Sequence, residues 1–193
     1  YKYNIDERAM VYYSSNYNLM KISCYVNRSN TLDNILSDIY YPEFISFANR
    51  YNLDIDREDL MYSLKSNESI DDSNIEAYRK AINYLVNNPS MQIDIRLIKE
   101  LWLLLNPSYR DDANVLRNGE LNDPILNGDR FPEYSLDSDK VSTLLAKLLS
   151  FYNEQETLSV VTLACAFYSA FIYIAPLKSH NLEIANLLLM KIL

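Results

Sequence analysis

The sequence predicts an all-α fold, and three observations carry this prediction. The 193 residues include 49% hydrophobic residues, which is enough apolar side chain for the core of one ordinary domain. Only 2 Gly and 6 Pro are present, which argues against sandwiches, barrels and disorder. From Leu32 onward, apolar residues recur at the spacing of three and four that is typical of amphipathic helices.

Polar segments that hold Pro, Asn, Asp and Ser residues separate the apolar stretches and predict where helices begin and end. Thr31 and Ser73 are expected to cap helices, and Pro42 either starts a helix or kinks the one before it. Residues 1–30 show no clear period. The helices are expected to cover residues 32–39, 44–48, 56–65, 75–86, 95–105, 141–149, 158–174 and 183 onward.

Residues 107–134 differ from the rest of the chain. They hold both glycines together with several Asp, Asn and Pro residues, which predicts an irregular segment. A short β-hairpin is expected near residues 114–118. The predicted order is therefore a run of helices, one long irregular segment with a hairpin, and a second run of helices.

The uncharged stretch 158–177 is long enough to raise the question of a membrane-spanning helix. Its hydroxyl-bearing residues, and the lack of Lys or Arg on its N-terminal side, favour a buried core helix instead. Cys165 lies in this stretch and is expected to be a small core residue. With 2 Cys and 1 His in the whole chain and no ligand spacing among them, no metal site is expected.

The chain carries a net charge of −8 and shows no basic stripe, which argues against a nonspecific nucleic-acid binder. No signal peptide is visible and the cysteine usage fits a reducing compartment, so we expect a soluble cytoplasmic protein with no nucleic-acid or membrane partner. Delivery as a secreted effector stays open. Because the chain starts at Tyr1 and stops inside an apolar helical pattern, we expect it to be a piece of a longer protein.

The stretch F-I-Y-I-A-P-L-K-S-H-N-L-E-I-A-N-L-L-L, residues 171–189, resembles the signature of the Fic (filamentation induced by cAMP) domain family of nucleotidyltransferases. That signature reads H-P-F-x-[D/E]-G-N-[G/K]-R-x-x-R between an apolar lead-in and an apolar helix. In this alignment Ala175 replaces the catalytic His, Ser179 the metal-binding acid and Glu183 the phosphate-binding Arg. The aligned positions are Ala175, Pro176, Leu177, Ser179, His180, Asn181, Leu182, Glu183 and Asn186, of which Pro176 and Asn181 keep the family residue.

The resemblance covers residues 59–193 and extends to the order and spacing of segments. In the family a short flap that holds target side chains precedes the signature, and its counterparts here are Arg110, Asn114, Val115, Leu116 and Arg117. As charges of an irregular segment, Arg110 and Arg117 are otherwise expected to be solvated. The resemblance implies an N-terminal helical extension over residues 1–58 and a degenerate Fic-like domain, truncated at its C-terminus, over residues 59–193.

Many Fic proteins also carry an inhibitory helix of pattern [S/T]-x-x-x-E-[G/N], whose Glu pairs with the signature Arg. The best match here consists of Ser63, Asn67 and Glu68, in which Asn67 stands at the Glu position. Because Glu183 stands at the Arg position, both ends of that family salt bridge are replaced together. This supports the loss of the whole mechanism rather than a single substitution.

The resemblance therefore implies a catalytically inactive domain. Ala175 cannot take a proton, Ser179 is a poor Mg²⁺ ligand, and Glu183 repels a phosphate that an Arg would attract. No cofactor is expected. The favoured function is a protein-interaction or regulatory module whose partner is a protein segment at the flap, and a homo-oligomer or a complex with an active relative stays open.

Two other functions stay open at the level of the sequence. The first is a divergent Fic-type transferase that accepts a non-standard phosphate-containing donor, with His180 and Glu183 as its acid–base pair. The second is a structural module of a larger chain. His180 is also explained as an exposed loop histidine that caps the next helix, and Glu183 as a first-turn acid favoured by the helix dipole.

Overall fold

The computed structural model describes residues 40–53, 56–66, 69–109, 114–119, 121 and 137–193. In these ranges the chain forms seven helices, which confirms the all-α fold class. The helices are α3 (Tyr41–Arg50), α4 (Arg57–Ser66), α5 (Ser73–Asn87), α6 (Ile95–Leu105), α7 (Ser138–Glu154), α8 (Val160–Ile174) and α9 (Asn181–Ile192). The helix expected over 32–39 and its cap Thr31 lie outside the described residues.

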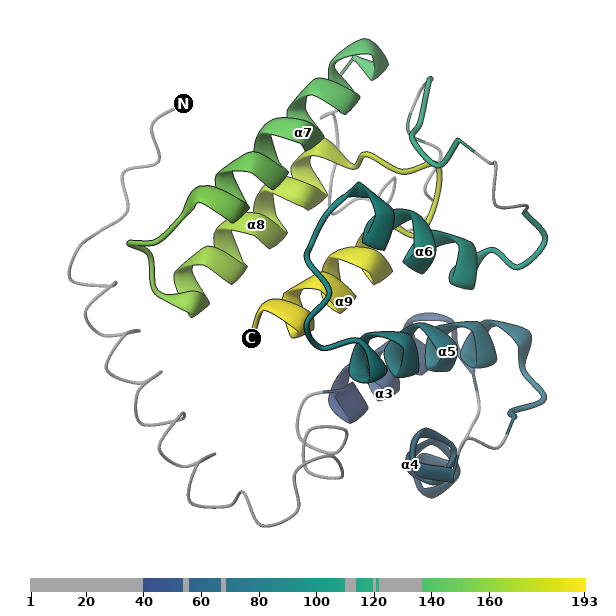
Figure 1. Ribbon diagram of the computed structural model, residues 1–193. Helices are drawn as coiled ribbons and strands as arrows, with labels where there is room; N and C mark the ends of the chain where they lie inside the picture. The colour runs from purple at the N-terminus through teal and green to yellow at the C-terminus, as the bar shows by residue number, and fades with distance from the viewer. Residues whose placement is uncertain (1–39, 54–55, 67–68, 110–113, 120, 122–136) are drawn as a thin grey trace.

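Helix α9 lies at the centre of the fold (Figure 1). Helix α8 packs along one side of α9, and α5 and α6 pack along the other. Helix α7 runs beside α8, to which a short connection joins it, so the two form an antiparallel hairpin. Helices α3 and α4 lie against α5, on the side away from α7 and α8.

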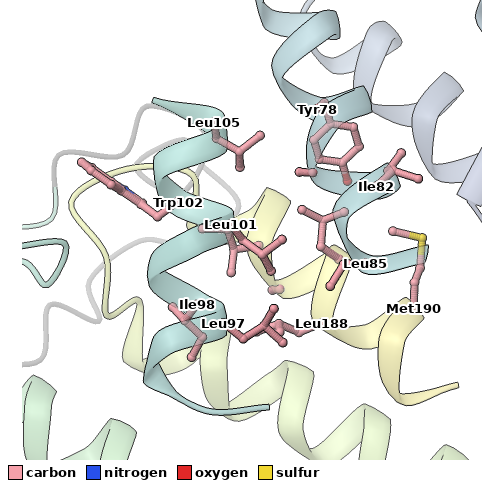
Figure 2. Close-up of a cluster of buried hydrophobic side chains, with 14 of the residues drawn as sticks. Tyr78, Ile82, Leu85, Leu97, Ile98, Leu101, Trp102, Leu105, Leu188 and Met190 are labelled. Carbon is pink, nitrogen blue, oxygen red and sulfur yellow. The ribbon is translucent and has the colours of Figure 1, made fainter. Parts of the chain in front are cut away.

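The side chains between α5, α6 and α9 form the centre of the hydrophobic core (Figure 2). Each such side chain stabilises the fold by about 1.5–3 kcal/mol when it is fully buried. Trp102, on α6, is also buried but points away from this cluster. The interlocking residues are Tyr78, Ile82 and Leu85 of α5, Leu97, Ile98, Leu101 and Leu105 of α6, and Leu188 and Met190 of α9.

The structure corrects two expectations about where helices begin. Asp72 rather than Ser73 caps α5, because its Oδ1 accepts hydrogen bonds from the N–H groups of Asn74 and Ile75 at 2.9 and 3.0 Å. Pro42 lies in the first turn of α3, but Tyr40 before it is also helical, so the choice between a helix start and a kink depends on residues outside the described ranges. The last helix begins at Asn181, two residues before Glu183.

The uncharged helix α8 is a core helix, as predicted, since it packs between α7 and α9. Within the ranges that the structure covers, none of the helices combines the length and the apolar character needed to cross a membrane. The prediction for Cys165 was wrong, because this cysteine is exposed. It lies on the outer face of α8, whereas Ala164, Phe167 and Phe171 fill the inner face; a helix without charges gives no sign of which face points outward.

Acid should weaken the fold through Glu76, on the first turn of α5. Its carboxylate accepts hydrogen bonds from Arg79 Nη2 and Nε at 2.7 and 2.8 Å and from the Ile70 N–H at 3.3 Å. The Arg79 bonds, partly opposed by burial, lower the pKa of Glu76 from 4.5 to about 2. A carboxylate with a lowered pKa stabilises the fold fully above the pKa of the unfolded chain, near 4.5, and this stabilisation is lost as the pH falls toward 2.

We therefore expect Glu76→Gln to lower the free energy of unfolding by about 2 kcal/mol at pH 7, with a smaller loss at pH 3. Urea denaturation at both pH values measures this difference. Glu100→Gln is the matched control, because Glu100 is an exposed residue of α6. If the loss caused by Glu76→Gln were the same at pH 7 and pH 3, the carboxylate would not be the source of the acid sensitivity.

Candidate functional site

The loop of residues 175–180 connects α8 to α9 and contains five of the nine aligned signature positions. Left-handed backbone marks both of its ends, with a φ of 41° at Ala175 and 58° at His180. This conformation costs a residue that has a side chain about 1–2 kcal/mol. Contacts with the surrounding structure must therefore hold the loop in place.

Asn181, the first residue of α9, fastens the loop from the inside. Its Oδ1 accepts a hydrogen bond from the Leu177 N–H at 2.8 Å, and its Nδ2 donates one to the Leu177 carbonyl at 2.9 Å. Both residues are 0% exposed, and Leu177 belongs to the hydrophobic core. One side chain thus satisfies both backbone groups of a residue that water does not reach.

Residues 115–117, part of the predicted flap, pair with this loop. Leu116 and Leu177 form an antiparallel bridge. The Arg117 N–H donates to the Pro176 carbonyl at 3.0 Å, and the Lys178 N–H donates to the Val115 carbonyl at 3.1 Å. The described part of the flap is therefore joined to the loop, and the hairpin expected near residues 114–118 is not confirmed, because Leu116 pairs with Leu177 in an isolated bridge.

Arg117 connects the same segment to the end of α8 through its side chain. The guanidinium donates to the carbonyls of Ala175 at 2.8 Å, Ile174 at 3.3 Å and Gly119 at 3.0 Å. Arg117 is only 5% exposed, so its interpretation as a solvated loop charge was wrong. Burial lowers the pKa of Arg117, but a guanidinium stays charged in proteins, and a cation at a helix C-terminus is favoured by the helix dipole.

Glu183 lies in the first turn of α9, as the helix-dipole interpretation predicts, but it is fully buried. Its Oε1 accepts a hydrogen bond from the Tyr51 hydroxyl at 3.3 Å and lies 4.0 Å from Arg50 Nε. Its Oε2 has no hydrogen-bond partner and lies 3.7 Å from His180 Nδ1. The carboxylate that stands at the signature Arg position therefore faces an arginine from α3.

His180 is the imidazole of the loop and the side chain proposed there for acid–base chemistry. It occupies the N-cap position of α9 without making a side-chain cap hydrogen bond. Ser179 Oγ donates to Asn106 Oδ1 at 3.3 Å, and Ala175 has no titratable group. The His180 ring and the Glu183 carboxylate lie close enough for an ion pair but not for a hydrogen bond.

The remaining predicted positions lie apart from this loop or outside the described residues. Ser63 is buried in α4 and donates to the Leu60 carbonyl at 2.8 Å. Asn114 Oδ1 accepts from the Leu116 N–H at 3.2 Å, and Asn186 donates to Glu43 at 2.9 Å.

Arg110, Asn67 and Glu68 lie outside the described residues, and Leu182 is half-buried. In the described ranges, no group of three or more His, Cys, Asp or Glu residues is arranged to hold a metal ion.

Sequence reasoning missed the polar residues of α3 and α5 that surround Glu183. Arg50 Nη2 donates to Glu43 Oε1 at 2.6 Å, and the Tyr78 hydroxyl donates to the same oxygen at 2.9 Å. Burial, followed by the Glu43 charge, raises the pKa of Tyr78. Burial opposes the charge of Arg50, but the hydrogen bond and charge of Glu43 outweigh it, so the pKa of Arg50 is raised. The spacing of seven between Glu43 and Arg50, two helical turns, was the available signal.

No model of a known protein family and no curated protein sequence matches this chain. The resemblance to the Fic family stays a prediction. The candidate site is a loop that Asn181 fastens and that pairs with residues 115–117. The buried Glu183 follows it in α9.

Proposed function

We propose that this chain is a catalytically inactive, Fic-like domain that works as a protein-interaction or regulatory module. One observation carries the proposal: Leu177, Asn181 and Glu183, three of the aligned signature positions, are 0% exposed. Their side chains support the loop from within and offer nothing to a bound substrate. A nucleotidyltransferase needs the opposite arrangement, with donors and cations turned toward the phosphates.

The charge of the loop supports the same proposal. A carboxylate about 4 Å from a phosphate oxygen is repelled by roughly 1–4 kcal/mol at effective dielectrics of 80 to 20. Glu183 already faces Arg50, so the nearest cation is engaged within the protein. Ser179, which bonds to Asn106, is a weak ligand for a hard cation such as Mg²⁺. Ordered binding of a nucleotide triphosphate at this loop is therefore disfavoured.

The partner that the proposal favours is an extended protein segment that adds to the outer edge of residues 115–117. The bridge to the loop uses the Val115 carbonyl and the Arg117 N–H, so the backbone groups of Leu116 point to the opposite edge. An extended segment would add there by main-chain hydrogen bonds, as in other cases of strand addition. The Asn114 side chain, which holds the Leu116 N–H, would have to give way.

The spacing of His180 and Glu183 favours the second candidate, a divergent transferase with a non-standard phosphate-containing donor. In that case His180 would take the proton of the acceptor hydroxyl and Glu183 would orient the imidazole. The 3.7 Å between His180 Nδ1 and Glu183 Oε2 would have to shorten for this role.

A thermal-shift screen against ATP, GTP, CDP-choline and related donors, with and without Mg²⁺, tests the proposal. We expect no change in Tm with any donor, because Glu183 stands where the signature has its phosphate-binding Arg and Ser179 where it has its metal-binding acid. Incubation with radiolabelled donors and cell extract should then label no protein. Pull-down with the full chain, compared with a Leu116→Pro variant, would next test for a partner at the flap edge.

The opposite outcome has a clear signature. A donor that raises Tm, or transfers a labelled moiety at a rate that His180→Ala abolishes, would contradict the proposal and support the divergent transferase. Lys178→Ala is the matched control for that variant, because Lys178 lies in the same loop and bonds to Val115 through its backbone N–H, which the substitution keeps.

A further inference from the structure

A set of charged and polar side chains, the α3–α9 charge cluster, ties α3 to α5 and α9. A single oxygen, Oε1 of Glu43, accepts hydrogen bonds from Arg50 Nη2 at 2.6 Å, the Tyr78 hydroxyl at 2.9 Å and Asn186 Nδ2 at 2.9 Å. One carboxylate of α3 thus holds one residue of α5 and one residue of α9. The members of the cluster are Glu43, Arg50, Tyr51, Tyr78, Glu183 and Asn186.

The cluster contains two carboxylates for one guanidinium. Arg50 forms its short contact with Glu43, whereas its Nε lies 4.0 Å from Glu183 Oε1 and has no hydrogen-bond partner. Glu183 receives one long hydrogen bond, 3.3 Å from Tyr51, and its Oε2 has none although it is fully buried. A buried carboxylate that is short of donors destabilises the arrangement that buries it.

The charged groups that face Glu183 come from several elements, and among the residues that the structure describes none donates a hydrogen bond to Oε2. Helix α3 contributes Glu43 and Arg50, which already pair with each other. His180 lies at 3.7 Å and adds a positive charge only when it is protonated. Burial raises the pKa of the Tyr168 phenol on α8, the charges of Glu43 and Glu183 add to this, and the charge of Arg50 opposes it. A surplus of negative charge therefore stays within the cluster.

Apolar contacts hold α3 against the fold from the other direction. Phe44 and Phe47 are 0% and 2% exposed, and the ring of Phe47 stacks on Tyr78 with centroids 4.1 Å apart. Among the described helices, α3 packs mainly against α4 and α5 and not against α6, α7 or α8 (Figure 1). Its departure would hydrate Glu183 and Arg50 without opening the core between α8 and α9.

We infer that α3 is a releasable latch: it detaches as a unit before the rest of the fold opens, and its release uncovers Glu183 at the start of α9. Glu43 holds the latch closed, because its oxygen binds α5 and α9. Glu183 weakens the latch, because its charge is buried without enough donors. The functional role of the latch rests on the proposed function. Release of α3 would remove contacts to Glu183, which follows the loop of residues 175–180, and the partner segment is expected to bind beside this loop.

Hydrogen exchange of the full chain, followed by mass spectrometry, tests the latch without any partner or ligand. In the unmodified protein we expect the amides of α3 to exchange about tenfold or more faster than those of α6 and α8. Glu43→Gln should speed exchange in α3 by about a further tenfold and leave α6 and α8 unchanged. Glu183→Gln should slow exchange in α3, because it removes the surplus charge and keeps the shape of the side chain. Glu100→Gln, on exposed α6 surface, is the matched control.

If α3 is a latch, Glu43→Gln should speed hydrogen exchange in α3 and Glu183→Gln should slow it. These opposite effects distinguish a latch from ordinary packing. A purely structural cluster would lose stability in both variants, and every helix would then exchange faster together. Either faster exchange of α3 in Glu183→Gln, or equal exchange of α3, α6 and α8 in the unmodified protein, would overturn the inference. Because no donor or partner enters this experiment, its failure would leave the proposed interaction function untouched, and failure of that function would leave the latch intact.

Discussion

Replacing Arg117 by Met should lower the free energy of unfolding by about 2–4 kcal/mol, since hydrogen bonds to a charged group contribute about 1.5–3 kcal/mol each and Met keeps the buried aliphatic length. The guanidinium donates to three carbonyls, two of which, those of Ile174 and Ala175, end α8. The same change removes a cation from the negative end of the helix dipole. Urea denaturation measures the loss.

The control for this variant is Arg96→Met, because Arg96 is an exposed arginine of α6. Exposed substitutions of this kind usually change stability by no more than about 0.5 kcal/mol. Arg117→Lys should recover part of the loss, since an ammonium group reaches one carbonyl but does not have the fork that reaches three. A loss in Arg117→Met no larger than that in Arg96→Met would mean that water replaces the guanidinium at the end of α8.

The helices were predictable because their apolar residues repeat at a local spacing. Their boundaries were predicted less well, since residues 71–74 read D-D-S-N and each of these residue types is a good N-cap. Asp72 rather than Ser73 is the cap, a choice that depends on where the chain enters the helix. Cys165 shows a similar limit: an apolar helix without charges does not reveal which of its faces meets solvent.

The sequence identified the segments that form the candidate site but not how their side chains are arranged. The sequence predicted the loop between the last two helices and the segment of residues 114–117. It gave no sign that Arg117 is buried, because the carbonyls of Ile174 and Ala175 lie 57 and 58 residues away along the chain. The same holds for Tyr51 and Glu183, which are 132 residues apart. Contacts at such separations follow from the packing of the helices and have no local periodicity.

The structure also changes the meaning of Glu183. In the sequence alone, Glu183 was expected to be a replaced phosphate-binding Arg, an acid–base partner of His180 or a first-turn acid of the helix. In the fold, the same carboxylate faces Arg50 and accepts from Tyr51, so it takes part in holding α3. Glu183 is thus part of the contact between α3 and α9. This is a reason why His180 and Glu183 should be tested separately, since changing Glu183 also changes the attachment of α3.

Asn181 is the position at which a single substitution should most directly open the loop. Asn181→Leu keeps the approximate volume but leaves the buried N–H and carbonyl of Leu177 without partners. An unsatisfied buried group costs about 1–3 kcal/mol, so we expect the free energy of unfolding to fall by about 2–5 kcal/mol. Denaturation in urea, with Asn153→Leu on exposed α7 surface as the control, measures this loss.

The loss in Asn181→Leu should be accompanied by a local change that separates it from simple core damage. With Leu177 released, the bridge between Leu116 and Leu177 loses its anchor, so amides of residues 115–117 and of the loop should exchange faster than those of α6. Asn181→Asp should be intermediate, because it keeps the acceptor for the Leu177 N–H but loses the donor to its carbonyl and buries a charge. Unchanged exchange in residues 115–117 would show that this segment is held by Arg117 alone, and that the loop and flap segment are not one unit.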